Sequence, residues 1–394
     1  MSKQKSSRDY LSRILFLAVF LNGFEAAGYQ TSLGSIGKEY ALNETGMGIL
    51  ASVQLIAGLI APLVFGPLAD KAGKKKMLAV FLAAEAAAGA GLVLCRGYRV
   101  FAAGIFLIGL CVSTIQYTAI AALADLYPLS GNRKIGWITG FYSLGAVAAP
   151  LVCGYYLERG LSWKILFVLL GVTAILEAAA ASAMDFSPRE SGPEAADRQS
   201  AAGKWVFSGI FLLCAVMFLY VGFENGFAFF VNSYLTEILK ADRAYISLSL
   251  FWLAMIPARI LCGYLGRWNR QILIGSTCGA AAAALAVGTA GSGTAAIVLC
   301  LPLGFFCGAI YPSVLTRSLD FAGGRTATAT GMITAATGLG GAAVTALTGV
   351  MSQQLGLKQA LIALAGFLAA DIILALRLCF MQESSHKKEK EQGR

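Results

Sequence analysis

Apolar segments of roughly twenty residues recur along the chain and are separated by short polar stretches. A helix rises about 1.5 Å per residue, so a run of this length is long enough to cross the hydrocarbon core of a bilayer. The pattern therefore predicts an all-α membrane protein. The expected membrane-spanning helices, twelve in all, cover 10–31, 46–66, 76–95, 100–124, 135–157, 163–184, 205–236, 245–266, 271–290, 295–317, 326–352 and 359–381.

The longest polar interruption divides the predicted helices into two groups of six. It covers residues 185–204, with the sequence DFSPRESGPEAADRQSAAGK. We therefore expect an N-terminal six-helix bundle over 1–184 and a cytoplasmic linker over 185–204. A C-terminal six-helix bundle with a short basic tail is expected over 205–394.

An internal repeat supports this division into two halves. Three short matches occur in the same order in both halves, at offsets of 199, 197 and 195 residues, close to half the chain length. They are Gly23-Phe24-Glu25 with Gly222-Phe223-Glu224, Gly66-Pro67-Leu68 with Gly263-Tyr264-Leu265, and Ile138-Thr139 and Gly145 with Ile333-Thr334 and Gly340. Parallel repeats of this kind predict two pseudo-symmetric bundles with a cavity between them.

Composition agrees with a membrane protein and excludes other classes. Of the 394 residues, 57% are hydrophobic and only 13% are charged, whereas soluble domains are about 25% charged. The chain carries a net charge of +10, but its basic residues separate apolar runs and do not cluster on one module. A soluble enzyme, a nucleic-acid-binding protein and a disordered scaffold are all poor fits.

The distribution of basic residues predicts the orientation. The two ends of the chain and the even-to-odd connections hold about 20 of the 31 Lys and Arg residues, and the opposite connections hold about 8. Cytoplasmic loops are enriched in Lys and Arg. We therefore expect a multi-pass protein of the cell (plasma) membrane with both termini in the cytoplasm.

Cysteine and histidine give no sign of catalytic or metal chemistry. None of the nine Cys residues forms a CxxC pair, and the single His, His386, lies in the polar tail. No nucleophile–base pair or metal-ligand spacing is present. We expect no metal site, no cofactor and no enzymatic activity.

The most specific motif follows the second predicted helix. It reads Gly66-Pro67-Leu68-Ala69-Asp70-Lys71-Ala72-Gly73-Lys74-Lys75-Lys76. Gly73 is expected to break the helix, and Asp70 either to lie at the N-terminus of a neighbouring helix or to accept from a basic partner. These residues resemble the loop between helices 2 and 3 of the major facilitator superfamily, G-x-L-A-D-[RK]-x-G-[RK]-[RK], at every position. The resemblance implies transport by alternating access and a gating role for Gly66, Asp70, Gly73 and Lys74.

Ionisable groups inside predicted helices are candidates for energy coupling, because they are costly in a bilayer. Glu25 and Glu224 occupy matching positions in the repeat, and burial of a carboxyl group favours proton binding. In the superfamily, helices 1, 4, 7 and 10 line the cavity, so both are expected to carry protons. Glu85, Glu177 and Asp371 fall on helices that are peripheral there and are interpreted as structural, while Arg259 either pairs with an acid or reaches toward the membrane surface.

Neutral polar side chains complete the candidate cavity. Amides and tyrosines bind hydroxyl groups without adding charge, which suits a neutral polyhydroxyl solute, although the same residues also hold helices together. The expected substrate-binding residues are Asn22, Tyr29, Gln54, Gln116, Tyr117, Tyr142, Asn225, Asn232 and Tyr311. Of these, Asn22 and Tyr29 share a helix face with Glu25.

Helix 7 points to one branch of the superfamily. Its segments Leu219–Glu224 and Asn232–Leu235, with Ala309–Leu315 of helix 10, resemble the fucose–galactose–glucose proton symporters. An expected Trp before the Tyr234-Leu235 pair is missing, which weakens the case for sugar stacking. The resemblance implies a monomeric symporter whose partners are protons and a small organic solute, with a sugar favoured, and no nucleic acid.

Three different functions also fit parts of the sequence. A proton-driven efflux antiporter for drugs or metabolites is the first, because Gly136, Gly145, Pro150 and Gly154 fit the helix-5 signature of such proteins. Against it, Ala149 and Cys153 replace two of its glycines, and helix 4 lacks the pattern R-x-x-Q-G. A lipid flippase is the second, and a non-transporting sensor on the same fold is the third.

Overall fold

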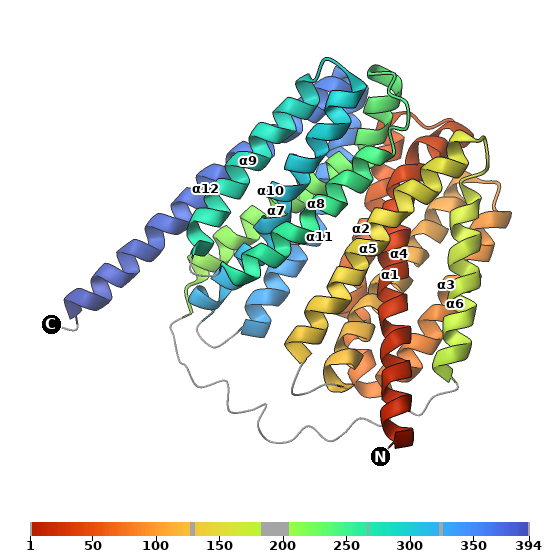
Figure 1. Cartoon of the computed structure of the whole chain (residues 1–394), viewed down its shortest axis with the longest axis horizontal. Helices are drawn as coiled ribbons and strands as arrows, with labels where there is room; N and C mark the ends of the chain where they lie inside the picture. The colour runs from red at the N-terminus through yellow and green to blue at the C-terminus, as the bar shows by residue number, and fades with distance from the viewer. Residues whose placement is uncertain (1, 127–130, 183–204, 266–267, 323–325, 393–394) are drawn as a thin grey trace. The chain divides into compact units, whose positions relative to one another are not determined.

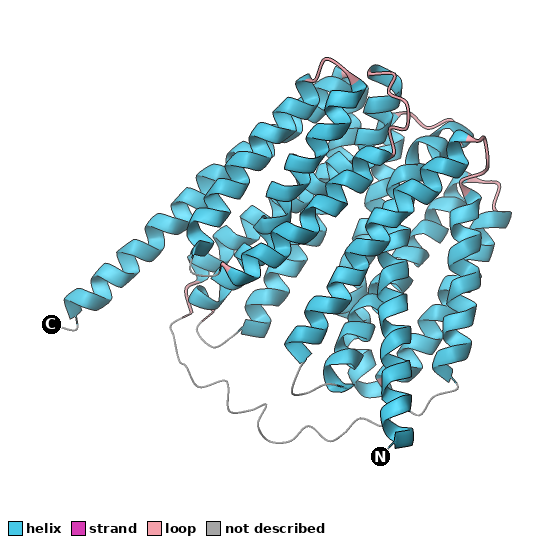
Figure 2. Ribbon diagram, in the orientation of Figure 1, coloured by secondary structure: helices cyan, strands magenta, loops and turns pink. Residues whose placement is uncertain are grey.

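The computed structural model describes residues 2–126, 131–182, 205–265, 268–322 and 326–392. Every regular element in these ranges is a helix, as Figure 2 shows. The predicted all-α fold is therefore confirmed. The linker expected over 185–204 lies outside the described residues.

The described helices match the twelve predicted runs, and most extend beyond them. The first six are α1 (Ser2–Glu39), α2 (Glu44–Ala72), α3 (Lys74–Leu94), α4 (Tyr98–Leu126), α5 (Gly131–Glu158) and α6 (Lys164–Ser182). The others are α7 (Phe207–Ser233), α8 (Ile246–Tyr264), α9 (Asn269–Thr289), α10 (Gly293–Phe321), α11 (Thr326–Leu355) and α12 (Leu357–Gln392). A short π-helical segment, η3 (Tyr234–Ile238), follows α7.

Length and apolar composition allow nearly all of these helices to cross a membrane. Within the described residues, 11 helices meet both conditions, and the apolar part of α8, Ile246–Cys262, is shorter. The hydrophobic runs thus correspond to real helices, and the chain is a multi-pass membrane protein.

The helices form two compact units, Met1–Ala195 and Ala196–Arg394. Figure 1 colours the first from red to yellow-green and the second from green to blue. In the first unit, α1 packs against α5, α2 against α4 and α3 against α6. In the second unit, α7 packs against α11, α8 against α10 and α9 against α12. Adding six to each helix number of the first unit therefore gives the pairs of the second unit, so both units use the same scheme of helix pairing.

Two glycines of the sequence repeat lie at very close helix contacts. A Cβ at Gly145 of α5 would lie 2.0 Å from the carbonyl oxygen of Phe20 in α1, and a Cβ at Gly340 of α11 would lie 2.1 Å from that of Phe218 in α7. Such distances leave no room for any side chain. The glycines of the sequence repeat thus mark equivalent crossings, where small residues let helix backbones meet.

Local signals set several helix ends. The Asn43 side chain accepts a hydrogen bond of 2.8 Å from the backbone N–H of Gly46 at the start of α2. The Ser292 hydroxyl accepts from the N–H of Ala295 at the start of α10. Gly73 separates α2 from α3 with a φ of 89°, a conformation that favours glycine, so the expected helix break is present.

Candidate functional site

Glu25 is buried inside the N-terminal unit, on an α1 face that packs against other helices. Its side chain is 0% exposed. The Gln54 amide of α2 donates a hydrogen bond of 2.7 Å from Nε2 to Glu25 Oε1. Glu25 Oε2 has no hydrogen-bond partner among the described residues. The two oxygens of this buried carboxyl group therefore differ: a neutral donor holds one, and no described residue donates to the other.

Two further polar residues on this face join α1 to its neighbours. Asn22 Nδ2 donates to the backbone carbonyl of Val112 in α4 at 3.0 Å. The Tyr29 hydroxyl donates to the backbone carbonyl of Leu50 in α2 at 3.2 Å. Both side chains are buried. The expected shared face thus exists, and its outer members fix the position of Glu25 between α2 and α4.

Glu224 lies on α7 in the C-terminal unit and has different partners. The Tyr220 hydroxyl, one turn earlier on the same helix, donates to Glu224 Oε2. Arg259 of α8 interacts electrostatically with the Glu224 carboxyl group. Tyr311 of α10 interacts electrostatically with both of these charged groups. Three helices therefore contribute to this second site.

The two repeated acids consequently occupy unlike surroundings. Glu25 has a neutral amide as its hydrogen-bond partner, whereas Glu224 has a phenol and a nearby guanidinium. Of the two possibilities considered for Arg259, its electrostatic interaction with Glu224 favours pairing with an acid. Arg259 also contacts the Met255 sulfur at 3.8 Å, through Nη2.

The remaining predicted substrate residues are only partly buried. Asn225 donates to the backbone carbonyl of Val221 on its own helix at 3.0 Å. Tyr117 of α4 and Tyr142 of α5 pack against the apolar core of the N-terminal unit. Gln116 and Asn232 are half-buried on α4 and α7. These residues lie on the expected helices without converging on Glu25 or Glu224 through any of these contacts.

The predicted gating residues are described only in part. The side chains of Gly66 and Asp70 lie outside the described residues. Gly73 forms the turn between α2 and α3, and Lys74 is half-buried in the first turn of α3.

Sequence reasoning missed one member of the second site. Tyr220 precedes Glu224 by four residues, so the two share a helix face, and this spacing is visible in the sequence. The sequence pattern singles it out only as part of the segment Leu219–Glu224. Glu85, Glu177 and Asp371, which the sequence predicts to be structural, are all buried, at 5%, 4% and 0% exposure.

Comparisons with known proteins bear on this architecture. The sequence profile of the Major Facilitator Superfamily matches residues 15–345 and, in a second match, 212–394. Protein TsgA of Salmonella arizonae is 24% identical over 326 residues, which is 79% of this chain and 80% of that protein.

Solved structures share the fold at low sequence identity. A bacterial homologue of the human lysosomal transporter Spinster has a TM-score of 0.79 at 14% identity, over 95% of this chain and 97% of that one. A D-xylose–proton symporter has a TM-score of 0.77 at 13% identity, over 94% and 97%. With the profile match, the twelve helices and the paired units, these findings show that the chain belongs to the Major Facilitator Superfamily of membrane transporters.

Proposed function

We propose that this protein is a proton-coupled symporter that moves a small polar organic solute, with a sugar favoured, by alternating access. The observation that carries the proposal is the Glu25 carboxyl group, which is fully buried and bound on one oxygen by Gln54. Its other oxygen lacks a hydrogen-bond partner among the described residues.

Physical chemistry connects this arrangement to proton coupling. A carboxylate in a low-dielectric interior costs several kcal/mol unless it is paired or protonated. Proton binding on Glu25 would remove that cost. The carrier with a bound proton would therefore favour different conformations from the carrier without one. Glu224 is the second proposed coupling group, with Tyr220 and Arg259 able to stabilise its ionised form.

The solute is proposed from the side chains around these acids. Gln54 beside Glu25 and Tyr311 beside Glu224 offer an amide and a phenol, which can bind hydroxyl groups in either direction. The structural likeness to a D-xylose–proton symporter supports the same class of substrate. Asp70, with Gly66, Gly73 and Lys74, is proposed to act in gating.

The setting of the transporter completes the proposal. We place the protein in the plasma membrane with both termini in the cytoplasm, as its basic loops favour. It is proposed to act as a monomer, with protons and one small solute as its partners. No role in nucleic-acid binding is proposed.

Efflux by antiport is the second candidate function. Pro150 is buried within α5, as in the helix-5 signature of antiporters. A buried acid, Glu25, and a partly buried one, Glu224, would also suit a cationic solute.

Proton movement in proteoliposomes tests the proposal and separates the two candidates. A pH-sensitive dye is enclosed in the vesicles, and monosaccharides and lipophilic cations are added outside in turn. Symport predicts that a monosaccharide drives protons inward together with itself. Proton movement only with cations, in the direction opposite to the cation, would replace symport with efflux.

The acids themselves supply the first prediction. Glu25→Gln and Glu224→Gln keep the size of the side chain but cannot release a proton. We expect each to abolish proton-driven accumulation while sparing exchange of labelled for unlabelled solute. Glu237→Gln, at an exposed position, serves as the control and should accumulate solute normally. Normal accumulation by both buried-acid variants would overturn the coupling assignment.

A further inference from the structure

Two more buried carboxyl groups accompany Glu25 in the N-terminal unit. Glu85 of α3 and Glu177 of α6 are 5% and 4% exposed. Glu85 interacts electrostatically with both Glu25 and Glu177. The packing of α3 against α6, and of α6 against α1, brings the three helices together. Among the described residues, the charged groups that act on Glu85 are thus two carboxyl groups and no cation.

Unpartnered oxygens show that this cluster is incomplete as it stands. Glu177 Oε1, like Glu25 Oε2, is buried without a hydrogen-bond partner in the described part of the chain. Leaving a buried polar atom unpaired costs about 1–3 kcal/mol. A bound proton, which turns a carboxyl oxygen into a donor, is the smallest ligand that would relieve this cost.

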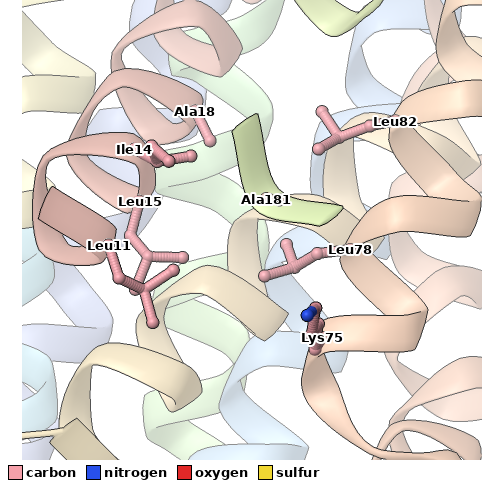
Figure 3. Close-up of a pocket in the computed structure, with 8 residues that line it drawn as sticks. All are labelled: Leu11, Ile14, Leu15, Ala18, Lys75, Leu78, Leu82 and Ala181. Carbon is pink, nitrogen blue, oxygen red and sulfur yellow. The ribbon is translucent and has the colours of Figure 1, made fainter. Parts of the chain in front are cut away.

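A hollow lies between the same three helices. About 330 Å³ of space here is not filled by atoms, but this volume includes space open to the surroundings, and the hollow itself has room for about one water molecule. Figure 3 shows the α1 residues on one side, Leu78 and Leu82 of α3 opposite, Ala181 of α6 between them and Lys75 at one end. The lining is otherwise apolar and comprises Leu11, Ile14, Leu15, Ala18, Leu78, Leu82 and Ala181.

The three acids continue the helix faces that line this hollow. Glu25 follows Ala18 by seven residues, Glu85 follows Leu78 by seven, and Glu177 precedes Ala181 by four. Residues at these spacings share a helix face, about one or two turns apart. Because successive spans alternate in direction, α6 runs opposite to α1 and α3. All three steps therefore lead the same way, from the hollow toward the acid cluster.

We propose that Glu25, Glu85 and Glu177 form one shared proton-binding site that exchanges with solvent through the hollow between α1, α3 and α6. The role of this site in transport rests on the proposed proton coupling. A proton that leaves one carboxyl group of the site binds another, so that one O–H bond breaks, one forms and the total charge is unchanged. An apolar hollow holds little water and would keep this exchange slow.

Other polar groups near the cluster come from α1, α2 and α4. Cys111 of α4 interacts electrostatically with Glu85, and Tyr29 of α1 with Glu25. The Gln54 amide supplies the neutral contact from α2.

The C-terminal unit repeats part of this arrangement and supplies an internal control. Cys307 of α10 and Asp371 of α12 correspond to Cys111 and Glu177 at offsets of 196 and 194 residues, and Cys307 interacts electrostatically with Glu224 and Asp371. At offset 197 from Glu85 the chain has Ala282. The middle carboxyl group is therefore missing, and Asp371 is expected to titrate separately from the cluster.

Infrared spectroscopy of the full chain in lipid nanodiscs, without any solute, tests the proposal. Protonated carboxyl groups give a carbonyl band that shifts in D₂O. Glu177→Gln should remove one component and shift those of Glu25 and Glu85, because the three share protons. Asp371→Asn should remove a separate component and leave the others in place. Unshifted components in Glu177→Gln would overturn the shared site.

Filling the hollow tests the route. Ala181→Phe should slow deuterium exchange of the cluster components and leave that of Asp371 unchanged. Equal exchange of the cluster in this variant and in the unaltered protein would overturn the route.

If Glu177→Gln does not fold, as judged by size-exclusion chromatography, Glu177→Asp takes its place and should shift the cluster components while keeping their number. The infrared experiments contain no solute, so a negative result would overturn the shared site without affecting the proposal of symport. A negative proteoliposome result would likewise overturn symport without affecting the shared site.

Discussion

Tyr220 is the residue through which α7 controls the orientation of Glu224. Its side chain is 1% exposed, and its hydroxyl donates to the carboxyl group one turn further along the helix. The contact is local, so it persists wherever α7 remains helical. A phenol in this position can also stabilise the ionised acid after a proton leaves.

Replacement of this hydroxyl gives a prediction at the residue scale. Tyr220→Phe is expected to lower the initial rate of solute-dependent proton movement severalfold and the free energy of unfolding by about 1 kcal/mol. Tyr234→Phe is the matched control, because the Tyr234 hydroxyl donates to the Gly288 carbonyl of α9 at 3.2 Å. It should lose similar stability and keep the transport rate. Unchanged transport in Tyr220→Phe would remove the residue from the coupling site.

The acids could be predicted from the sequence, but their partners could not. Glu25 and Glu224 interrupt long apolar runs at matching places in the repeat, which is visible without a structure. Gln54 interacts with Glu25, and Arg259 with Glu224, from other helices. Each lies too far from its acid in the sequence for a local pattern to predict the contact. Glu85 and Glu177 are predicted to be structural because their helices are peripheral in related transporters. The electrostatic interactions of Glu85 with Glu25 and Glu177 are not visible in the sequence.

At the scale of the element, glycine determines how closely α1 approaches α5. The Cβ of any other residue at position 145 would lie 2.0 Å from the Phe20 carbonyl oxygen, well inside van der Waals contact. The backbone of one helix would have to move. Since the same contact recurs between α7 and α11 at Gly340, both crossings depend on a missing side chain.

Substitution of these glycines tests the argument. Gly145→Ala is expected to destabilise the protein by about 1–3 kcal/mol through overpacking. Gly140, on the same helix, has nothing within 4 Å of the Cβ it would gain. Gly140→Ala should therefore be neutral or stabilising, by up to about 1 kcal/mol, because alanine favours the helix. Unfolding in mixed detergent micelles measures both, and equal effects would contradict the tight crossing.

Hydropathy predicts the helices well but not their internal irregularities. The seventh apolar run predicts one helix over 205–236, whereas α7 ends at Ser233 and continues as the π-helical η3. A change from α-helical to π-helical hydrogen bonding does not alter the number of apolar residues in the run. The hydropathy pattern therefore cannot predict it. Leu239 then donates to the Tyr234 carbonyl and closes the segment.

For the whole molecule, the shared pairing scheme explains why a weak sequence repeat is informative. Few residues match between the halves, but the matches include the glycines at the α1–α5 and α7–α11 contacts. The fold could thus be predicted from twelve apolar runs and a few positions where packing tolerates only glycine. The partners of buried polar groups could not, because each unit places different residues around the same framework.

The proposed orientation leads to a prediction for the whole chain. In variants otherwise lacking cysteine, Ser162→Cys and Ser292→Cys should react with a membrane-impermeant maleimide added to intact cells. Both positions are exposed, and both lie in connections expected outside. Lys76→Cys, at the start of α3, should react only after the membrane is opened. The reverse pattern of labelling would place the termini outside.

The unlike surroundings of the two repeated acids have an electrical consequence. An ionised Glu224 is offset by Arg259, whereas an ionised Glu25, held by a neutral amide, adds a full negative charge to its unit. Membrane voltage acts on net charge, with about 2.3 kcal/mol for each elementary charge moved across 100 mV. In the proposed cycle, the membrane potential would therefore act on the N-terminal half while Glu25 is ionised, and on the C-terminal half while Glu224 is protonated and leaves the charge of Arg259 uncompensated.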